Sequence, residues 1–166
     1  MRLTLRPLEP TDEQAAIAAH EQMADWDFLL GWHAQPWADH LATLDDESRG
    51  RNLPEGRVPA TFLVAVIDGE IVGRLSLRHE LNAWLAKYGG HLGYGVLPTH
   101  QGRGVATEIL RQGLSLARET GLEQVLLTCD DDNLASARVI EKLGGVLQDR
   151  WSSADGVVHR RYWIEL

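Results

Sequence analysis

Residues 94–107 join a β-like run to an amphipathic helix through Gly102 and Gly104, an arrangement that can bind an anion. The first N–H groups of a helix have no partner within the helix, and the aligned peptide dipoles place partial positive charge there. Glycines let the main chain bend tightly and let bulky oxygens approach these amides, and Arg103 can add a forked cation at the rim. The segment therefore predicts a phosphate-binding site.

The two common nucleotide-binding patterns do not fit this segment. The Walker pattern is absent, and Thr107 stands where the dinucleotide-binding pattern needs its third glycine. The segment fits Gln/Arg-x-x-Gly-x-Gly/Ala instead, through Gln101, Gly104 and Ala106. This pattern resembles the coenzyme A pyrophosphate loop of the GNAT acetyltransferase superfamily. A strand-to-helix turn without a ligand is the alternative interpretation of these residues alone.

Residues 133–145 resemble the second signature of the same superfamily, Asn-x-x-Ser/Ala followed by a helix that ends in Glu-Lys-Leu-Gly. Asn133 is a favourable N-cap, and Gly144 or Gly145 suits the left-handed position after a helix. A second helix start therefore points towards the ligand. The resemblance runs from about Thr61 to the C-terminus, and several of its runs look most like a bacterial group of predicted acetyltransferases. Those runs are 89–94, 127–130 and 161–164.

The resemblance implies acetyl-CoA as co-substrate. We expect its peptide-like pantetheine arm to pair with free N–H and C=O groups near Val96 and Leu97, as an added strand would. Gly93 and Gly95 predict a bulge or a close backbone approach, where a free strand N–H stabilises the oxyanion. The implied cofactor-binding residues are Val96, Leu97, Gln101, Gly102, Arg103, Gly104, Val105, Ala106, Thr107, Asn133 and Ser136.

The implied reaction moves an acetyl group to a primary amine of a small molecule or a protein, by direct attack in a ternary complex. A lysine-like amine has a pKa of about 10.4 and is mostly protonated at neutral pH, so a base or a water chain must remove its proton. His91 is the first choice for this base, and His79 and Glu80 on the neighbouring strand are further candidates. Each candidate also has a structural interpretation. His91 can be a structural histidine hydrogen-bonded to the main chain, and His79 and Glu80 can be surface residues at the end of a strand.

One position departs from the family pattern. Many relatives place a tyrosine in the second signature to protonate the departing thiolate, and Ile140 stands at the matching position. Tyr94, Ser136 or a water can supply this proton, or the thiolate leaves without an acid. Ser136 also fits a plain helix residue. The alternative function is a non-catalytic acyl-CoA-binding sensor or interaction domain, and Ile140 is the feature that favours it.

The N-terminal third is rich in aromatic residues and is where substrate choice should lie. Trp26, Phe28, Trp32 and Trp37 either fill a helix–helix core or form an aromatic wall for an amine cation or an apolar group. No metal is expected, because no carboxylate or cysteine completes a recognised ligand spacing with His33 and His40. The acidic run 130–132 could also suggest a metal, but it fits better as a loop before a helix N-terminus, where the dipole favours negative charge.

Composition predicts one domain over residues 1–166, which is long enough for a single core. The net charge of −8 argues against a nucleic-acid partner. No apolar run approaches the roughly 20 residues of a membrane span, and the N-terminus lacks a signal-peptide core, so a cytoplasmic protein without a membrane partner is expected. The sequence leaves a homodimer open.

Hydrophobic patterning predicts an α/β architecture of strands and helices in mixed order. Together with the resemblance it implies a GNAT-like fold, in which a mixed, mostly antiparallel sheet splays at the cofactor site between flanking helices. The order of the third predicted strand, a helix, a strand and a helix implies parallel neighbours with crossover helices. An exposed loop at 48–59 is expected to border the substrate cleft. Strands are predicted at 2–6, 61–67, 70–78, 90–96, 123–128, 146–151 and 157–164, and helices from 13, over 37–47 and 104–119, and from 133.

Overall fold

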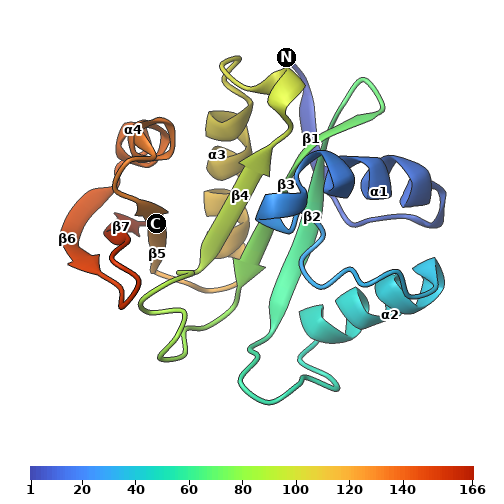
Figure 1. The fold of residues 1–166 in the computed structure, drawn as a ribbon, viewed down its shortest axis with the longest axis horizontal. Helices are drawn as coiled ribbons and strands as arrows, with labels where there is room; N and C mark the ends of the chain where they lie inside the picture. The colour runs from blue at the N-terminus through green and yellow to red at the C-terminus, as the bar shows by residue number, and fades with distance from the viewer.

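A computed structural model describes residues 1–166 as seven strands and four α-helices (Figure 1). The strands are β1 (Leu3–Arg6), β2 (Ala60–Ile67), β3 (Glu70–Arg78), β4 (Leu92–Val96), β5 (Gln124–Asp130), β6 (Val146–Ser152) and β7 (Val158–Glu165). The helices are α1 (Glu13–Gln22), α2 (Trp37–Ser48), α3 (Val105–Glu119) and α4 (Leu134–Lys142). Short 3-10 turns are η1 (Pro10–Asp12), η2 (Ala24–Trp26) and η3 (Pro98–His100). The predicted elements are all present, with ends that differ by one or two residues.

The strands form two separate antiparallel sheets, in the orders β1-β2-β3-β4 and β5-β7-β6. The expected single sheet, splayed at the cofactor site, is thus divided into two, because β4 and β5 do not form a ladder. One backbone hydrogen bond joins them, from His91 N–H just before β4 to Leu126 C=O at 2.8 Å. Beyond this bond β4 and β5 diverge, so the predicted splay extends along the whole of β4 and leaves the two strand edges free to face a ligand.

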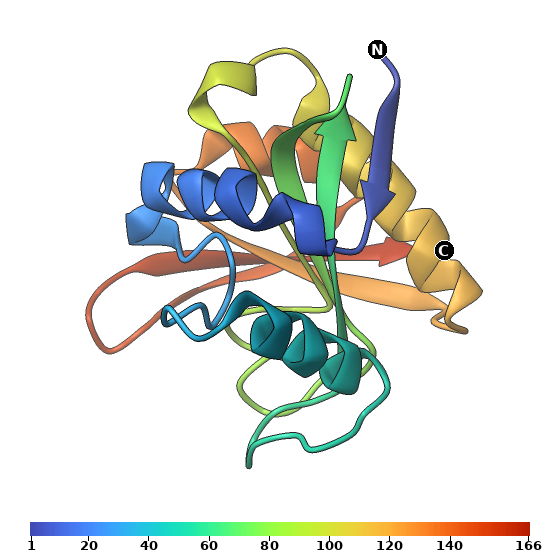
Figure 2. The same ribbon diagram turned by 90° about the vertical axis from the view of Figure 1, so that its right-hand side faces the viewer.

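Helices cover both faces of the four-stranded sheet (Figures 1 and 2). Helices α1 and α2 pack on one face, and α3 packs on the other, against β1, β3 and β4. The larger apolar cluster lies on the α3 side and also includes Leu127, Ile140 and Tyr162 from the second sheet and α4. The smaller cluster fills the α1–α2 side around Phe28 and Trp37. Burial of these side chains contributes about 25 cal/mol for each Å² of apolar surface removed from water, which holds both layers against the sheet.

Glycines and one capping side chain set the ends of α3 and α4 next to the expected ligand site. Gly104 is the N-cap of α3 in the left-handed conformation, with φ of 81°. Gly144 follows α4 with φ of 96°, as the sequence predicts for a helix C-terminus. Asn133 caps α4, because its side-chain oxygen accepts a hydrogen bond from Ser136 N–H at 3.1 Å. Both helix starts therefore lie beside the free edge of β4. No helix combines the length and the apolar character that crossing a membrane requires.

Candidate active site

The loop before α3 presents a row of free backbone donors. From Gly102 to Thr107 no backbone N–H has an acceptor within the protein. Gly102 and Gly104 have φ of 72° and 81°, and a Cβ on either would meet no atom within 4 Å, so the loop is open on the side where a ligand approaches. Gln101 anchors it to the sheet, because its side-chain amide donates to Val96 C=O at 3.1 Å. These consecutive amides suit a diphosphate.

This loop forms one wall of a cavity of about 400 Å³, which we call the β4 cavity. Its other walls are β4, the start of α4 and the segment around η2. Nine of the eleven predicted cofactor-binding residues line it: Val96, Gln101, Gly102, Gly104, Val105, Ala106, Thr107, Asn133 and Ser136. Leu97 is buried and outside the lining, and the exposed Arg103 is also outside it.

The free edge of β4 supplies a second set of donors and acceptors. Leu97 N–H donates to Val72 C=O at 2.8 Å, and Arg78 N–H donates to His91 C=O at 2.7 Å. Because hydrogen-bonded and non-hydrogen-bonded pairs alternate in an antiparallel ladder, the backbone groups of Tyr94 and Val96 face away from β3. The expectation of a free N–H at Leu97 is therefore wrong, and Val96 C=O is also occupied by Gln101. Tyr94 N–H and C=O and Val96 N–H remain for a ligand.

Two predicted proton donors meet across the splay. The Tyr94 hydroxyl lies 2.8 Å from Ser136 Oγ, which joins β4 to the first turn of α4, and both residues line the β4 cavity. Burial raises the pKa of Tyr94 to about 12, with a smaller opposing effect from the Ser136 hydrogen bond. Tyr94 therefore keeps its proton at neutral pH. Ile140, by contrast, is fully buried in the larger core cluster and has no access to the cavity.

His91 lies between the two sheets. It is 6% exposed, its backbone N–H donates to Leu126 C=O, and its Nδ1 accepts from Leu126 N–H at 2.9 Å. Burial, and secondarily the positive charge of Arg78, lowers the pKa of His91. His91 lines neither of the two main cavities, and its contacts match the structural alternative, a histidine hydrogen-bonded to the main chain. Its action as the base stays a prediction.

His79 and Glu80, the further base candidates, lie at the end of β3 and also outside both cavities. His79 Nε2 lies 2.8 Å from Thr61 Oγ1 on β2, and burial lowers the pKa of this imidazole. Glu80 is exposed. This geometry resembles that of strand-end surface residues more than that of a cavity base.

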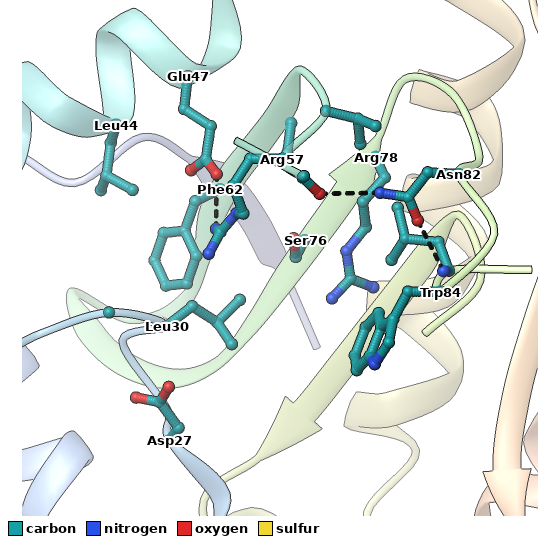
Figure 3. A pocket seen from close by; sticks show the side chains of 15 residues that line it. Asp27, Leu30, Leu44, Glu47, Arg57, Phe62, Ser76, Arg78, Asn82 and Trp84 are labelled. Atoms are coloured by element: carbon teal, nitrogen blue, oxygen red, sulfur yellow. Dashed lines mark hydrogen bonds and ion pairs between the residues drawn. The ribbon is translucent and has the colours of Figure 1, made fainter. Parts of the chain in front are cut away.

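A second cavity of about 420 Å³ lies on the α1–α2 side of the first sheet, and we call it the β3 cavity (Figure 3). Its floor contains Ser76 and Arg78 of β3. Its rim joins two loops, because Asn82 donates to Gly56 C=O at 2.9 Å and Arg57 forms an ion pair with Glu47 of α2 at 2.7 Å. The loop before β2 therefore borders this cavity, as the sequence predicts for the segment next to the substrate cleft.

The segment at η2 separates the two cavities. Trp26 lines the β4 cavity and its neighbour Asp27 lines the β3 cavity. The Trp26 ring lies on β4, since a Cβ added to Gly95 would be 2.0 Å from its Cη2. The Arg74 guanidinium stacks over the same ring, 3.9 Å from its centroid. Trp26 belongs to the aromatic run for which the sequence leaves a core and a wall open, and Gly95 predicts a close backbone approach without identifying this ring as its partner.

The aromatic N-terminal third divides between the two interpretations. Phe28 and Trp37 are buried in the smaller core cluster and Trp32 packs against it, while Trp26 is 38% exposed and forms a cavity wall. His40 is buried and contacts Gln35 at 3.0 Å. The structure contains no cluster of histidine, cysteine and carboxylate side chains with the arrangement of a metal site.

The sequence of this chain matches a model of a known protein family. The model described as an acetyltransferase (GNAT) domain matches residues 2–146. The chain belongs to the GNAT acetyltransferase family. The match includes the N-terminal third, which lies outside the region where the two signatures are found. The GNAT assignment and the α/β fold predicted from these signatures are thus confirmed.

Curated relatives of this GNAT domain are named mycothiol acetyltransferase. One from Thermobispora bispora is 31% identical over 163 residues, which is 93% of this chain and 52% of the relative. Another from Salinispora tropica is 30% identical over 153 residues, which is 89% of this chain and 48% of the relative. The chain therefore spans about half the length of these relatives.

Solved structures share the GNAT fold at low sequence identity. RimL, titled a ribosomal L7/L12 alpha-N-protein acetyltransferase in complex with coenzyme A, has a TM-score of 0.72 at 17% identity, covering 99% of this chain and 94% of that one. Mycobacterium smegmatis RimJ, in complex with a CoA-disulfide, has a TM-score of 0.70 at 23% identity, covering 98% of this chain and 81% of that one. These likenesses establish the fold.

Proposed function

We propose that this chain is an N-acetyltransferase that moves the acetyl group of acetyl-CoA to a primary amine by direct attack in a ternary complex. The observation that carries the proposal is the row of unpaired N–H groups from Gly102 to Thr107, which opens into the β4 cavity. The acceptor is a small-molecule or peptide amine. No metal takes part in the proposed reaction.

Acetyl-CoA fits the groups that surround the β4 cavity. The amides of the loop and the start of α3 bind the diphosphate, because they present donors and a helix dipole to it. The free backbone groups of Tyr94 and Val96 pair with the pantetheine arm in the manner of an added strand. Two structural neighbours, RimL in complex with coenzyme A and RimJ in complex with a CoA-disulfide, support this choice of ligand.

The reaction forms an N–C bond to the acetyl carbon and breaks its C–S bond. Val96 N–H, which has no strand partner, is the donor for the oxyanion that develops on the carbonyl. The amine must lose a proton before or during the attack, and the departing thiolate must gain one. Tyr94 supplies this proton and becomes a phenolate, and the Ser136 hydroxyl, 2.8 Å away, stabilises that phenolate by donating a hydrogen bond to it. The Tyr94–Ser136 pair thus takes the proton-donor role of the tyrosine that many relatives have at the position of Ile140.

The amine proton has two proposed acceptors, water and His91. His91 has its Nδ1 committed to Leu126 N–H and lines neither cavity. The acceptor enters from the β3 cavity, which lies on the other side of Trp26 and Asp27 from the β4 cavity. Water in this cavity can carry the proton away from the amine, with His91 retained as the predicted alternative.

A thiol-release assay with acetyl-CoA and a panel of amines tests the proposal, together with calorimetry of acetyl-CoA binding. We expect binding and turnover with at least one class of amine. Binding without turnover across the panel would favour the acyl-CoA sensor, for which Ile140 is the supporting feature. Absence of binding at saturating acetyl-CoA would contradict both functions.

A further inference from the structure

The β3 cavity contains a half-buried cation, Arg78, that forms no ion pair within the protein. Arg78 projects from the end of β3 into the cavity, and its single side-chain hydrogen bond runs from Nη1 to Gly89 C=O at 3.2 Å (Figure 3). No carboxylate oxygen lies within 4.0 Å of its nitrogens. Burial, and secondarily the charge of Arg57, lowers the pKa of Arg78, while the charge of Glu47 raises it by a smaller amount. A buried arginine normally meets a carboxylate or a phosphate.

The other charged groups of the cavity are arranged so that Arg78 stays available. Glu47 of α2 lies across the cavity beside Leu44, where it is bound to Arg57 at 2.7 Å (Figure 3). Asp27 lies on the side of Leu30, away from the Trp84 side on which Arg78 lies (Figure 3). Its carboxylate lies 3.9 Å from His20 Nδ1, a nitrogen that accepts a hydrogen bond from Leu29 N–H, and its charge also acts on Arg74. The cavity thus has a cation without an ion pair on one side and an exposed carboxylate on the other.

Gly93 leaves room for the Arg78 guanidinium beside β4. A Cβ on Gly93 of β4 would lie 3.1 Å from Arg78 Nη1, so the guanidinium lies directly against the strand that also lines the β4 cavity. Ser76, the β3 partner of Gly93, adds a hydroxyl to the floor beside it. Phe62, Leu30 and Leu85 supply apolar walls. A small ligand with one anionic group and an apolar body is complementary to these surroundings.

We propose that the acceptor carries a carboxylate in addition to its amine, and that Arg78 binds this carboxylate in the β3 cavity. This inference rests on the proposed N-acetyltransferase function. The amine lies towards Asp27, whose carboxylate attracts the ammonium form next to the partition and the β4 cavity. The substrate class is a small amino acid or a related aminocarboxylate. Arg78 is then a specificity-determining residue of the acceptor site.

Matched acceptors test this inference: an amino acid, its amide and the amine that lacks the carboxyl group, compared for several side chains. We expect kcat/KM for the amino acid to exceed that of its two analogues by about 10- to 100-fold, the worth of a charge-assisted hydrogen-bonded pair. Arg78→Gln should abolish this advantage, and Arg78→Lys should retain part of it. Arg49→Gln is the matched control, because it removes an exposed arginine that is paired with Asp45 and lies outside both cavities, and it should keep the preference.

Ligand binding without turnover gives an independent readout. Ligand-observed NMR should detect the amino acid bound to the wild-type protein and not to Arg78→Gln, while both proteins bind acetyl-CoA with equal affinity, which also shows that the variant is folded. A wild-type preference for the amide or the decarboxylated amine, or equal binding of the amino acid to Arg78→Gln, would overturn the inference. These outcomes differ from failure of the N-acetyltransferase proposal, which is loss of acetyl-CoA binding or of turnover with every amine.

Discussion

The β4 cavity and the β3 cavity lie on either side of Trp26 and Asp27 but are built from different kinds of group. The β4 cavity offers mainly backbone donors, from Gly102 to Thr107 and along the free edge of β4. The β3 cavity offers mainly side chains, among them Arg78, Ser76 and Asp27, from segments far apart in the chain. Backbone groups recognise the part of a ligand that all members of a family share, whereas side chains can change from one protein to the next and so set the acceptor.

Gly104→Asp should break the backbone-built cavity most completely. The new side chain would point into the open space of the loop, at a residue whose φ of 81° already disfavours it, and would bring a negative charge to the diphosphate site. We expect acetyl-CoA affinity to fall by more than about 100-fold, because both the steric and the charge effect oppose binding. Calorimetry measures it.

Gly156→Asp is the control for this substitution, since Gly156 also has a positive φ, of 84°, with open space around its Cβ position, but lies in the β6–β7 turn. It should lose stability without losing acetyl-CoA affinity. An unchanged affinity in a folded Gly104→Asp protein would contradict the assignment of the loop.

Tyr94→Phe tests the one side-chain pair that the proposed chemistry needs within the backbone-built cavity. The hydroxyl is lost while the ring remains, so we expect kcat to fall by about 10- to 100-fold and acetyl-CoA affinity to change by less than about threefold. Ser136→Ala should give a smaller loss. The double variant should resemble Tyr94→Phe, because the two residues act as one unit. Additive losses would mean that Tyr94 and Ser136 act separately.

His91→Gln tests whether the link between the two sheets is structural or catalytic. Removal of Nδ1 leaves the buried Leu126 N–H without its acceptor, and we expect a loss of about 2 kcal/mol in the free energy of unfolding, measured by urea denaturation. His33→Gln, an exposed position, controls for the substitution itself. A fully folded His91→Gln protein with normal acetyl-CoA affinity and a turnover reduced more than about 100-fold would instead establish His91 as the base.

The pH dependence of stability gives a smaller effect with a defined sign. Burial lowers the pKa of His91, and also of His40 and His79, from an ordinary value of 6.5. The unfolded chain then binds more protons than the folded one, so this stability is fully present above about pH 6.5 and declines as the pH falls below it. We expect the wild-type free energy of unfolding to fall between about pH 7 and pH 5, and less steeply in His91→Gln. An equal slope in both proteins would contradict the buried, neutral state of His91.

The regions that sequence reasoning reached are those in which local backbone geometry decides the outcome. The conformational preferences of Gly102 and Gly104 indicate a left-handed loop, and that of Asn133 indicates a helix cap. The loop, the cap and the strand and helix boundaries were therefore predictable. The separation of β4 from β5 was only partly predictable, because the order of strands in the chain does not show whether two strand edges form hydrogen bonds. Tyr94 and Ser136 were candidates individually, but their contact at 2.8 Å depends on the splay.

The side-chain-built cavity was beyond reach for a physical reason. Arg78, Glu47 and Asp27 carry charges that look equally solvated in the sequence, and only the fold pairs Glu47 with Arg57 and leaves Arg78 without a carboxylate. Trp26 likewise resembles the neighbouring core tryptophans in type and spacing. Its place against Gly95 follows from the packing of η2 on β4, a contact between segments almost seventy residues apart.

The most direct test of the central claim is an amide NMR titration of the whole chain with acetyl-CoA. The account predicts that the largest chemical-shift changes fall on the N–H groups from Gly102 to Thr107, with further changes at Tyr94 and Val96. Shifts concentrated around Arg78 and Asn82 in the β3 cavity, with the loop amides unchanged at saturation, would contradict it.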